Sequence, residues 1–132
     1  MPEMRMGKSE SRPRLLIAED DEDARLALGT LLSSQYDIRL EECVEGALRS
    51  YGEARPDLLV VDYALPDATG VQLLEEIQAR CGEAVAPAIM ISAYRDQRLR
   101  SRRAGFHAFV EKPYRTLDLI WAIERALVRS ER

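Results

Sequence analysis

Side chains that can do chemistry stand at the ends of several short apolar runs in this sequence. They comprise three carboxylates, a hydroxyl and an amine, namely Glu19, Asp20, Asp62, Ser92 and Lys112. Carboxylates that lie close together raise one another's pKa unless a cation intervenes. A hard divalent cation such as Mg²⁺ binds a few carboxylate oxygens and keeps its other positions for water or phosphate. The set therefore predicts a Mg²⁺ site where one carboxylate attacks phosphorus while the amine and the hydroxyl stabilise the phosphoryl oxygens.

Such a site requires a fold that brings distant residues together, and the apolar pattern predicts one. Strands are expected at 15–18, 38–40, 58–61, 88–91 and 108–110, and helices at 24–32, 44–51, 71–81, 96–103 and 116–127. Uniformly apolar strands separated by helices indicate a parallel sheet that is covered on both faces. Ligands of such α/β sheets bind at the carboxyl ends of the strands, which is where the five side chains stand.

Length, composition and charge limit the class of protein. The chain of 132 residues suits one domain, expected over 14–130 and preceded by a flexible segment over 1–13. The net charge of −4 argues against direct nucleic-acid binding. No apolar run approaches the roughly 20 residues of a membrane span, and the first residues lack an apolar signal core. Cys43 and Cys81 have no metal-binding spacing and are expected to be free thiols, so a cytoplasmic location is predicted.

Four stretches of the sequence resemble, in order and in spacing, the motifs of response-regulator receiver domains in two-component signalling. They are LLIAEDDEDAR, PDLLVVDYALPDATG, AIMISA and AGFHAFVEKPY, and the resemblance extends from Arg14 to Leu127. It implies an α/β fold of the flavodoxin-like type, a (βα)5 sandwich whose five-stranded parallel sheet has the order 2-1-3-4-5. In this order, the strands that precede the five chemical side chains are neighbours.

The resemblance also implies roles for the residues of the site. Asp62 matches the phosphoacceptor, which is the residue that becomes modified. Lys112 matches the lysine that pairs with the phosphoryl group, and together with Ser92 these residues form the catalytic set. The implied Mg²⁺ ligands are the side chains of Glu19, Asp20 and Asp62 and the backbone carbonyl of Ala64.

A switch is implied at two positions. Ser92 matches the hydroxyl that moves toward the phosphoryl group, and Phe109 matches the aromatic ring that moves inward with it. Two alternatives stay open, because Ser92 also suits a simple strand end and an aromatic residue on a strand is commonly part of the core. The peptide bond between Lys112 and Pro113 is implied to be cis, which aims the lysine.

The implied function is that of a signalling switch and not of an enzyme, since a receiver catalyses only its own phosphorylation and dephosphorylation. Its phosphodonor would be a sensor histidine kinase or a histidine phosphotransfer protein. Its output would pass through the surface of the fourth helix, fifth strand and fifth helix to a downstream protein target or a second copy of the chain. Five arginines near this surface suit either such a partner or a solvated helix face, and they are Arg95, Arg98, Arg100, Arg102 and Arg103.

Other functions remain open at this point. A Mg²⁺-dependent phosphatase also uses an aspartate nucleophile, but it needs a second aspartate two residues later, where this chain has Ala64. A flavodoxin-like FMN binder needs a phosphate-binding loop after the first strand, where this chain has carboxylates that repel phosphate. A receiver that works without phosphate is a third alternative. The sequence suits a stand-alone receiver as well as part of a larger regulator or hybrid kinase.

Two positions of the receiver pattern affect the lifetime of the phosphorylated form. Ala64 and Tyr94 stand two residues after Asp62 and Ser92, where members of the family tune the attack of water. Alanine cannot orient that water molecule, and tyrosine shields the acyl phosphate. We therefore expect slow self-dephosphorylation.

Overall fold

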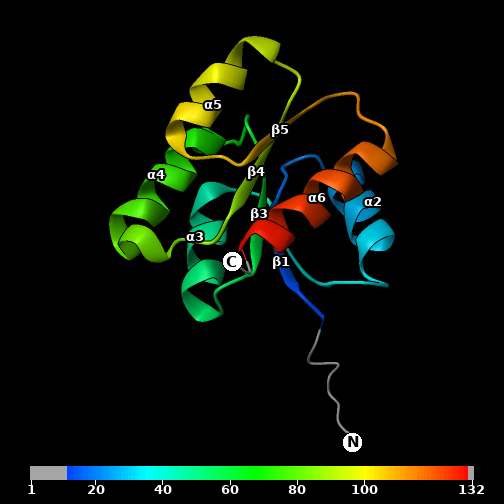
Figure 1. Ribbon diagram of the computed structural model, residues 1–132, viewed down its shortest axis with the longest axis horizontal. Coiled ribbons are helices and arrows are strands. Elements are labelled where there is room, and N and C mark those ends of the chain that lie inside the picture. Colours follow the sequence, from blue (N-terminus) through cyan, green and yellow to red (C-terminus); the bar gives the residue numbers. More distant parts are fainter. Residues whose placement is uncertain (1–11, 131–132) are drawn as a thin grey trace, which may run out of the picture.

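Five short strands alternate with helices along residues 12–130, which are the residues that the computed structural model describes (Figure 1). The strands are β1 (Arg14–Ala18), β2 (Asp37–Glu41), β3 (Leu58–Asp62), β4 (Ala88–Ser92) and β5 (Ala108–Glu111). The helices are α2 (Glu22–Leu32), α3 (Val44–Glu53), α4 (Gly70–Cys81), α5 (Arg98–Ala104) and α6 (Thr116–Ser130), with short 3₁₀ turns η1 (Gly82–Ala84) and η2 (Arg95–Gln97). The predicted alternation of strands and helices is confirmed.

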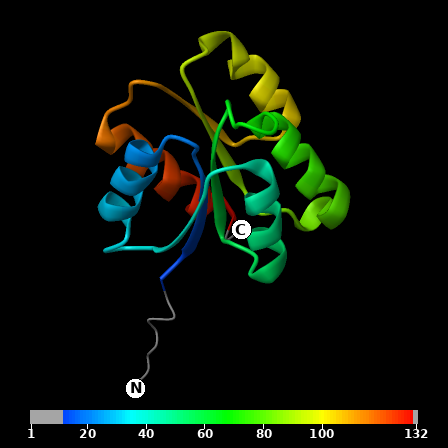
Figure 2. The same cartoon turned by 180° about the vertical axis from the view of Figure 1, so that it is seen from behind.

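The strands form one parallel sheet in the order β2-β1-β3-β4-β5, which confirms the predicted fold class and strand order. Helices α2 and α6 cover one face of the sheet, and α3, α4 and α5 cover the other (Figure 1, Figure 2). The central strands are therefore buried on both faces, and every residue of β3 and β4 is buried. This burial explains why these strands appear in the sequence as unbroken apolar runs.

Alternate residues of each strand enter two separate cores, one on each face of the sheet. Leu16 belongs to the core that includes Ile77 of α4, whereas the next residue, Ile17, belongs to the core that includes Ile123 of α6. Full burial of one such side chain contributes about 2 kcal/mol. Because the strands are held from both faces, the residues that follow them have well-defined positions.

The ends of the helices follow local signals in the sequence. Asp21 is the N-cap of α2 and accepts a hydrogen bond from an amide of the first turn at 2.8 Å. Thr69 and Gln72 form a capping box at the start of α4. Helix α5 ends at Ala104 and is followed by the C-cap Gly105, whose φ of 114° is positive and therefore favours glycine. The helix predicted over 96–103 is present, but its beginning is the 3₁₀ turn η2.

The flexible segment predicted over 1–13 falls almost entirely outside the described residues, which begin at Arg12. The carbonyl of Pro13 accepts a hydrogen bond from the amide of Asp37 at 2.9 Å, at the start of β2. Across residues 12–130, no helix is both long enough and apolar enough to cross a membrane.

Candidate metal centre

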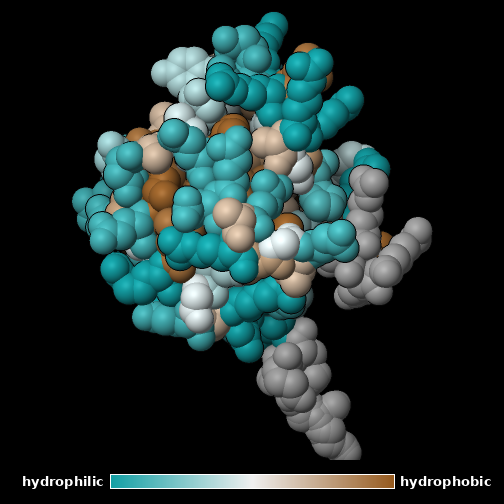
Figure 3. Space-filling model, turned by 90° about the vertical axis from the view of Figure 1, so that its left-hand side faces the viewer, coloured by the Kyte–Doolittle hydropathy of each residue, from teal (hydrophilic) through white to brown (hydrophobic). Residues whose placement is uncertain are grey.

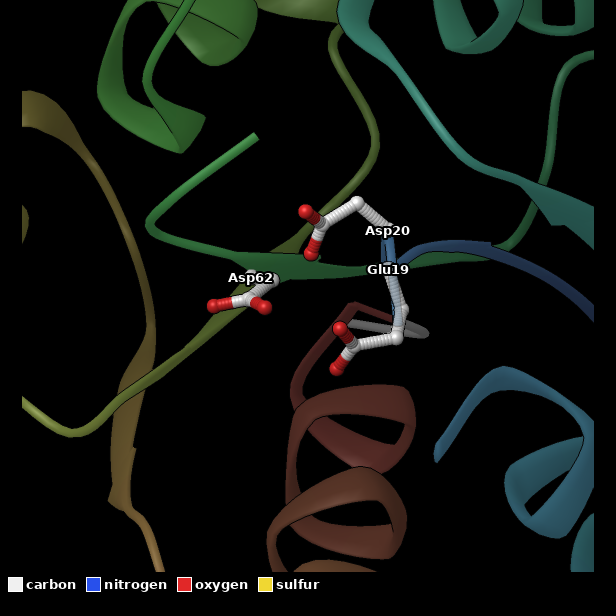
Figure 4. Close-up of side chains that lie close together, drawn as sticks. All are labelled: Glu19, Asp20 and Asp62. Atoms are coloured by element: carbon white, nitrogen blue, oxygen red, sulfur yellow. The ribbon is translucent and has the colours of Figure 1, made fainter. Parts of the chain in front are cut away.

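The carboxyl ends of β1 and β3 bring three carboxylates together. Glu19 and Asp20 directly follow β1, and Asp62 is the last residue of the neighbouring β3. One oxygen atom from each side chain lies within 4.8 Å of the other two. The three carboxylates border a common space in Figure 4. A cluster of the kind that the sequence predicts therefore forms at this edge of the sheet.

The backbone of Glu19 and Asp20 is held from two sides. The amide of Glu19 donates to the carbonyl of Glu41 at 2.9 Å. Nη1 of Arg25 donates to the carbonyls of Glu19 and Asp20 at 3.0 and 3.3 Å. Glu19 is only 2% exposed, whereas Asp20 is exposed. The cluster thus has a buried side and a side that is open to solvent.

Lys112, which follows β5, balances part of the negative charge. Its Nζ donates to Oδ2 of Asp62 at 3.0 Å and to Oε1 of Glu19 at 3.2 Å. The amide of Lys112 donates to the carbonyl of Ser92 at 2.9 Å, and its peptide bond to Pro113 is cis, as predicted. One lysine therefore contacts two of the three carboxylates.

The charges of the cluster favour a further cation. Burial raises the pKa of Glu19, the amide of Asp21 partly lowers it, and the neighbouring carboxylate of Asp62 raises it again. Burial alone would lower the pKa of Lys112, but its contacts with Asp62 and Glu19 outweigh burial, so this pKa is raised and the amine stays charged. Three carboxylates beside one ammonium group leave excess negative charge, and carboxylate oxygens are the donors that Mg²⁺ prefers. The donor set therefore fits Mg²⁺.

The loop after Asp62 returns to the end of β3. The amide of Ala64 lies 3.4 Å from Oδ1 of Asp62, and Ala64 pairs with Thr69 in an isolated antiparallel bridge. Gly70 begins α4, and a Cβ at this position would lie 2.6 Å from the carbonyl oxygen of Asp62. Only glycine permits so close an approach. The loop thus places the backbone of Ala64 beside the carboxylate of Asp62.

Ser92 ends β4, the strand next to β3. It is fully buried, and its hydroxyl accepts a hydrogen bond from the amide of Tyr94 at 2.9 Å. In this structure the hydroxyl is therefore held by its own loop. With Ser92 included, the five side chains singled out in the sequence all follow or end strands at the same edge of the sheet.

Comparison with known proteins identifies the family. The family model of the response regulator receiver domain matches residues 15–124. The chain belongs to this family. The receiver is 35% identical over 121 residues to the transcriptional regulatory protein PdtaR of Mycobacterium tuberculosis. The aligned residues make up 88% of the chain and 57% of PdtaR. It is 36% identical over 103 residues to the sensor histidine kinase AtsR of Burkholderia thailandensis. This alignment includes 74% of the chain and 17% of AtsR.

Solved receiver structures share this fold. A CheY-like receiver domain protein from Methanospirillum hungatei is 26% identical with a TM-score of 0.84, over 92% of this chain and 98% of that one. Our chain spans little more than half the length of PdtaR and a smaller part of AtsR. Receiver domains are signalling switches of two-component systems, generally bind Mg²⁺ through acidic residues, and pair with sensor histidine kinases.

Phe109, the predicted aromatic switch residue, lies half-buried on β5 of this receiver. The guanidinium of Arg98 lies 4.8 Å from the centre of its ring. Both residues line a groove of about 330 Å³ between α5, β5 and α6, together with Trp121 and Arg125. The side of the molecule that carries α3, α4 and α5 is largely hydrophilic, with small separate hydrophobic areas (Figure 3). The groove lies on the surface that the receiver pattern predicts for partners.

Three contacts around the site were not predicted from the sequence. The first is the double contact of Arg25 with the backbone of the acidic pair. In the second, the rings of Tyr63 and Tyr94 meet edge to face with their centres 5.9 Å apart. In the third, Asp67 accepts two backbone amides of α3. No periodicity or motif in the sequence joins the partners of these contacts, so no sequence signal predicts them.

Proposed function

We propose that this receiver takes a phosphoryl group on Asp62 from a sensor histidine kinase or a histidine phosphotransfer protein in a Mg²⁺-dependent reaction. The observation that carries the proposal is the surroundings of Asp62. Its carboxylate belongs to the acidic cluster and also lies 3.0 Å from Nζ of Lys112. A nucleophile at this position has a cationic partner, the ammonium of Lys112, for the charge of an incoming phosphoryl group. Acceptance of a phosphoryl group is general to the receiver family.

Four groups of the chain would hold the Mg²⁺ ion, and they are the carboxylates of Glu19, Asp20 and Asp62 and the backbone carbonyl of Ala64. The three carboxylates support this assignment because their oxygens already lie within 4.8 Å of one another. When bound, the ion supplies positive charge to the phosphoryl oxygens. Asp20 lies on the solvent side of the cluster, so a phosphodonor has access there.

Asp62 would be the nucleophile of the transfer step. One of its carboxylate oxygens forms a bond to phosphorus, while the bond from phosphorus to the imidazole nitrogen of the donor breaks. That nitrogen keeps the electron pair and, after taking up a proton, leaves as neutral imidazole. The ammonium of Lys112 and the hydroxyl of Ser92 donate hydrogen bonds to the phosphoryl oxygens and stabilise their charge.

Phosphorylation would then change the surface formed by α5, β5 and α6. The Ser92 hydroxyl accepts a hydrogen bond from the amide of Tyr94 and keeps its own proton to donate, so turning toward a phosphoryl oxygen would change its contact with the loop that carries Tyr94. This movement displaces the loop before η2, and it alters the packing around Phe109 on the neighbouring strand. Because the phosphoryl group makes these contacts in only one of the two states, it shifts the equilibrium between them.

A downstream protein or a second copy of the chain would bind the same surface. Leu117 and Trp121 of α6 are 76% and 62% exposed, and large exposed apolar side chains suit a protein interface. Three arginines line the adjoining groove, and they are Arg98, Arg102 and Arg125. In a second copy, the carboxylates of Asp118 and Glu124 would provide partners for these cations, in support of apolar contacts.

The phosphatase and FMN alternatives have less support at this site. A phosphatase with an aspartate nucleophile needs a general acid two residues after it, and Ala64 offers only a methyl group there. The phosphate of FMN would meet three carboxylates at the end of the first and third strands, and like charges repel.

The proposed function is tested by incubating the chain with acetyl phosphate and Mg²⁺ and measuring its intact mass. We expect a gain of one phosphoryl group that disappears when the metal is chelated. Asp62→Asn should abolish the gain, whereas Asp57→Asn, at the opposite end of β3, should leave it unchanged. No gain in the unaltered chain, together with no binding of beryllofluoride, would contradict the proposal.

A further inference from the structure

The loop between β3 and α4 is attached at its middle to a different helix by a single carboxylate. Oδ1 of Asp67 accepts a hydrogen bond from the amide of Val44 at 2.8 Å, and Oδ2 accepts one from the amide of Glu45 at 3.0 Å. These amides belong to the first turn of α3, where backbone donors have no partner within the helix. Asp67 therefore joins the loop that follows Asp62 to the start of α3.

The cap that α3 carries in its own sequence is weak, so this contact is important to both partners. The N-cap residue is Cys43, whose sulfur accepts from the amide of Gly46 at 3.4 Å. Sulfur is a poor acceptor compared with a carboxylate. The charged oxygens of Asp67 accept from the first two amides of α3, which Cys43 leaves without an acceptor. The two amide contacts also lower the pKa of Asp67, so its carboxylate stays charged.

The segment that Asp67 holds includes Ala64, whose carbonyl is a proposed Mg²⁺ ligand. The base of the loop is closed by the bond from the amide of Gly70 to the carbonyl of Tyr63 at 2.8 Å and by the bridge between Ala64 and Thr69. Leu65 anchors the loop in the core. Asp67 fixes a further part of the loop against a separate element, the start of α3. Without it, the loop samples more conformations, and ordering the Ala64 carbonyl costs more conformational entropy.

From these contacts we propose that Asp67 is a positioning residue for the metal site: it holds the loop that carries a proposed Mg²⁺ ligand, the carbonyl of Ala64. This inference rests on the proposed function, because it assumes that Mg²⁺ binds at Glu19, Asp20 and Asp62. It assigns Asp67 no contact with the ion or with the phosphoryl group. Its effect should therefore appear in the affinity for Mg²⁺ and not in the transfer step itself.

The chain offers a matched control for a carboxylate that only caps a backbone amide. Oδ2 of Asp57 accepts a hydrogen bond from the amide of Arg14 at 2.8 Å, and Asp57 is exposed, like Asp67. Asp57 precedes β3, whereas Asp67 follows it, so the two residues lie at opposite ends of the sheet. If a lost cap weakened Mg²⁺ binding only by destabilising the fold, the Asp57 and the Asp67 variants would both bind Mg²⁺ more weakly. If Asp67 positions the loop, only the Asp67 variants should lose affinity for Mg²⁺.

The test is calorimetric titration of the full chain with MgCl₂, well below its unfolding temperature. For Asp67→Ala we expect Mg²⁺ binding weaker by about three- to tenfold, up to the lower limit of the loss when a residue that orients a metal ligand is removed. Asp67→Asn, which keeps one acceptor oxygen, should lose less affinity for Mg²⁺. Asp57→Ala should bind Mg²⁺ as tightly as the unaltered chain. Hydrogen exchange at the amides of Val44 and Glu45 should accelerate in the Asp67 variants. At saturating Mg²⁺ their phosphorylation by acetyl phosphate should approach the unaltered rate.

Two results would overturn the inference, and they can be told apart. If the unaltered chain binds Mg²⁺ while Asp67→Ala and Asp67→Asn bind it equally well, Asp67 only caps α3 and the proposed function stands. If the unaltered chain binds no Mg²⁺, the proposed function fails and the inference fails with it.

Discussion

Two aspartates at opposite ends of β3 have the same side chain but differ in burial, in hydrogen-bond partners and in charged neighbours. Asp57 precedes the strand, is exposed, and accepts one hydrogen bond from the amide of Arg14 at 2.8 Å. Asp62 ends the strand, is 7% exposed, and lies 3.0 Å from the ammonium of Lys112 within a cluster of carboxylates. One carboxylate is thus a solvated hydrogen-bond acceptor, and the other belongs to a crowded charged cluster.

In this fold, the chemistry available to an aspartate depends on which end of the strand it occupies. At the carboxyl end, the loops after β1, β3, β4 and β5 meet, because these strands are parallel and adjacent. Side chains from three of these strand ends contact one another there, because Lys112 donates to both Glu19 and Asp62. At the amino end, the Asp57 carboxylate accepts a hydrogen bond from a backbone amide and, within residues 12–130, contacts no charged group.

Replacing the lysine of the carboxyl end should have the largest effect. In Lys112→Met, Asp62 and Glu19 lose their ammonium partner, and the phosphoryl oxygens lose a cationic donor. We expect the rate of phosphorylation at saturating Mg²⁺ to fall about a hundredfold, as when one charge-stabilising donor is removed from an active site. Intact-mass time courses measure this rate. Arg14→Met, which removes a cation at the amino end of the sheet, should change the rate of phosphorylation little. An equal loss of rate in both variants would contradict the difference between the two ends of the sheet.

The residue two positions after Asp62 should set how long the phosphoryl group stays. Ala64 cannot orient a water molecule, and the edge-to-face rings of Tyr63 and Tyr94 add bulk beside the site. In Ala64→Asn, an amide that positions the attacking water should accelerate loss of the phosphoryl group about tenfold. The decay of the phosphorylated mass after removal of acetyl phosphate measures it. A half-life of seconds in the unaltered chain with Mg²⁺ would contradict the expected slow dephosphorylation.

The smallest effect concerns stability in acid. The amides of Val44 and Glu45 hold the pKa of Asp67 below its ordinary value of 3.8, so its carboxylate stabilises the fold above that pH. This contribution should be lost as the pH falls through the lowered pKa, because the folded state must then take up a proton. In Asp67→Asn the free energy of unfolding should therefore depend less on pH in this acid range. Chemical denaturation at several pH values measures the difference, and identical pH profiles would contradict it.

Much of the fold and of the cluster could be predicted from the sequence, because both follow from local patterns. Buried parallel strands require apolar runs, so β1, β3 and β4 stand out, and the residues that follow them are visible at once. The resemblance to receivers then supplied the strand order, which the structure confirms. This strand order places Glu19 and Asp62 at the ends of neighbouring strands.

The contacts that hold the site in place could not be predicted in this way. Asp67 is 22 residues from Glu45 in the sequence and lies in a polar loop without periodicity. Nothing in such a loop indicates which helix its carboxylate will cap. The two carbonyls that Arg25 contacts are likewise backbone groups, which carry no sequence signal. These contacts depend on how the loops pack, and packing of loops is not encoded by the period of apolar residues.

The most direct test of the central claim is to locate the phosphoryl group on the chain. The protein is phosphorylated with acetyl phosphate and Mg²⁺, reduced with borohydride, which converts an aspartyl phosphate to homoserine, and then sequenced by peptide mass spectrometry. We predict homoserine at position 62 and unmodified aspartate at positions 20 and 57. Homoserine at another position, with position 62 unmodified, would contradict the account.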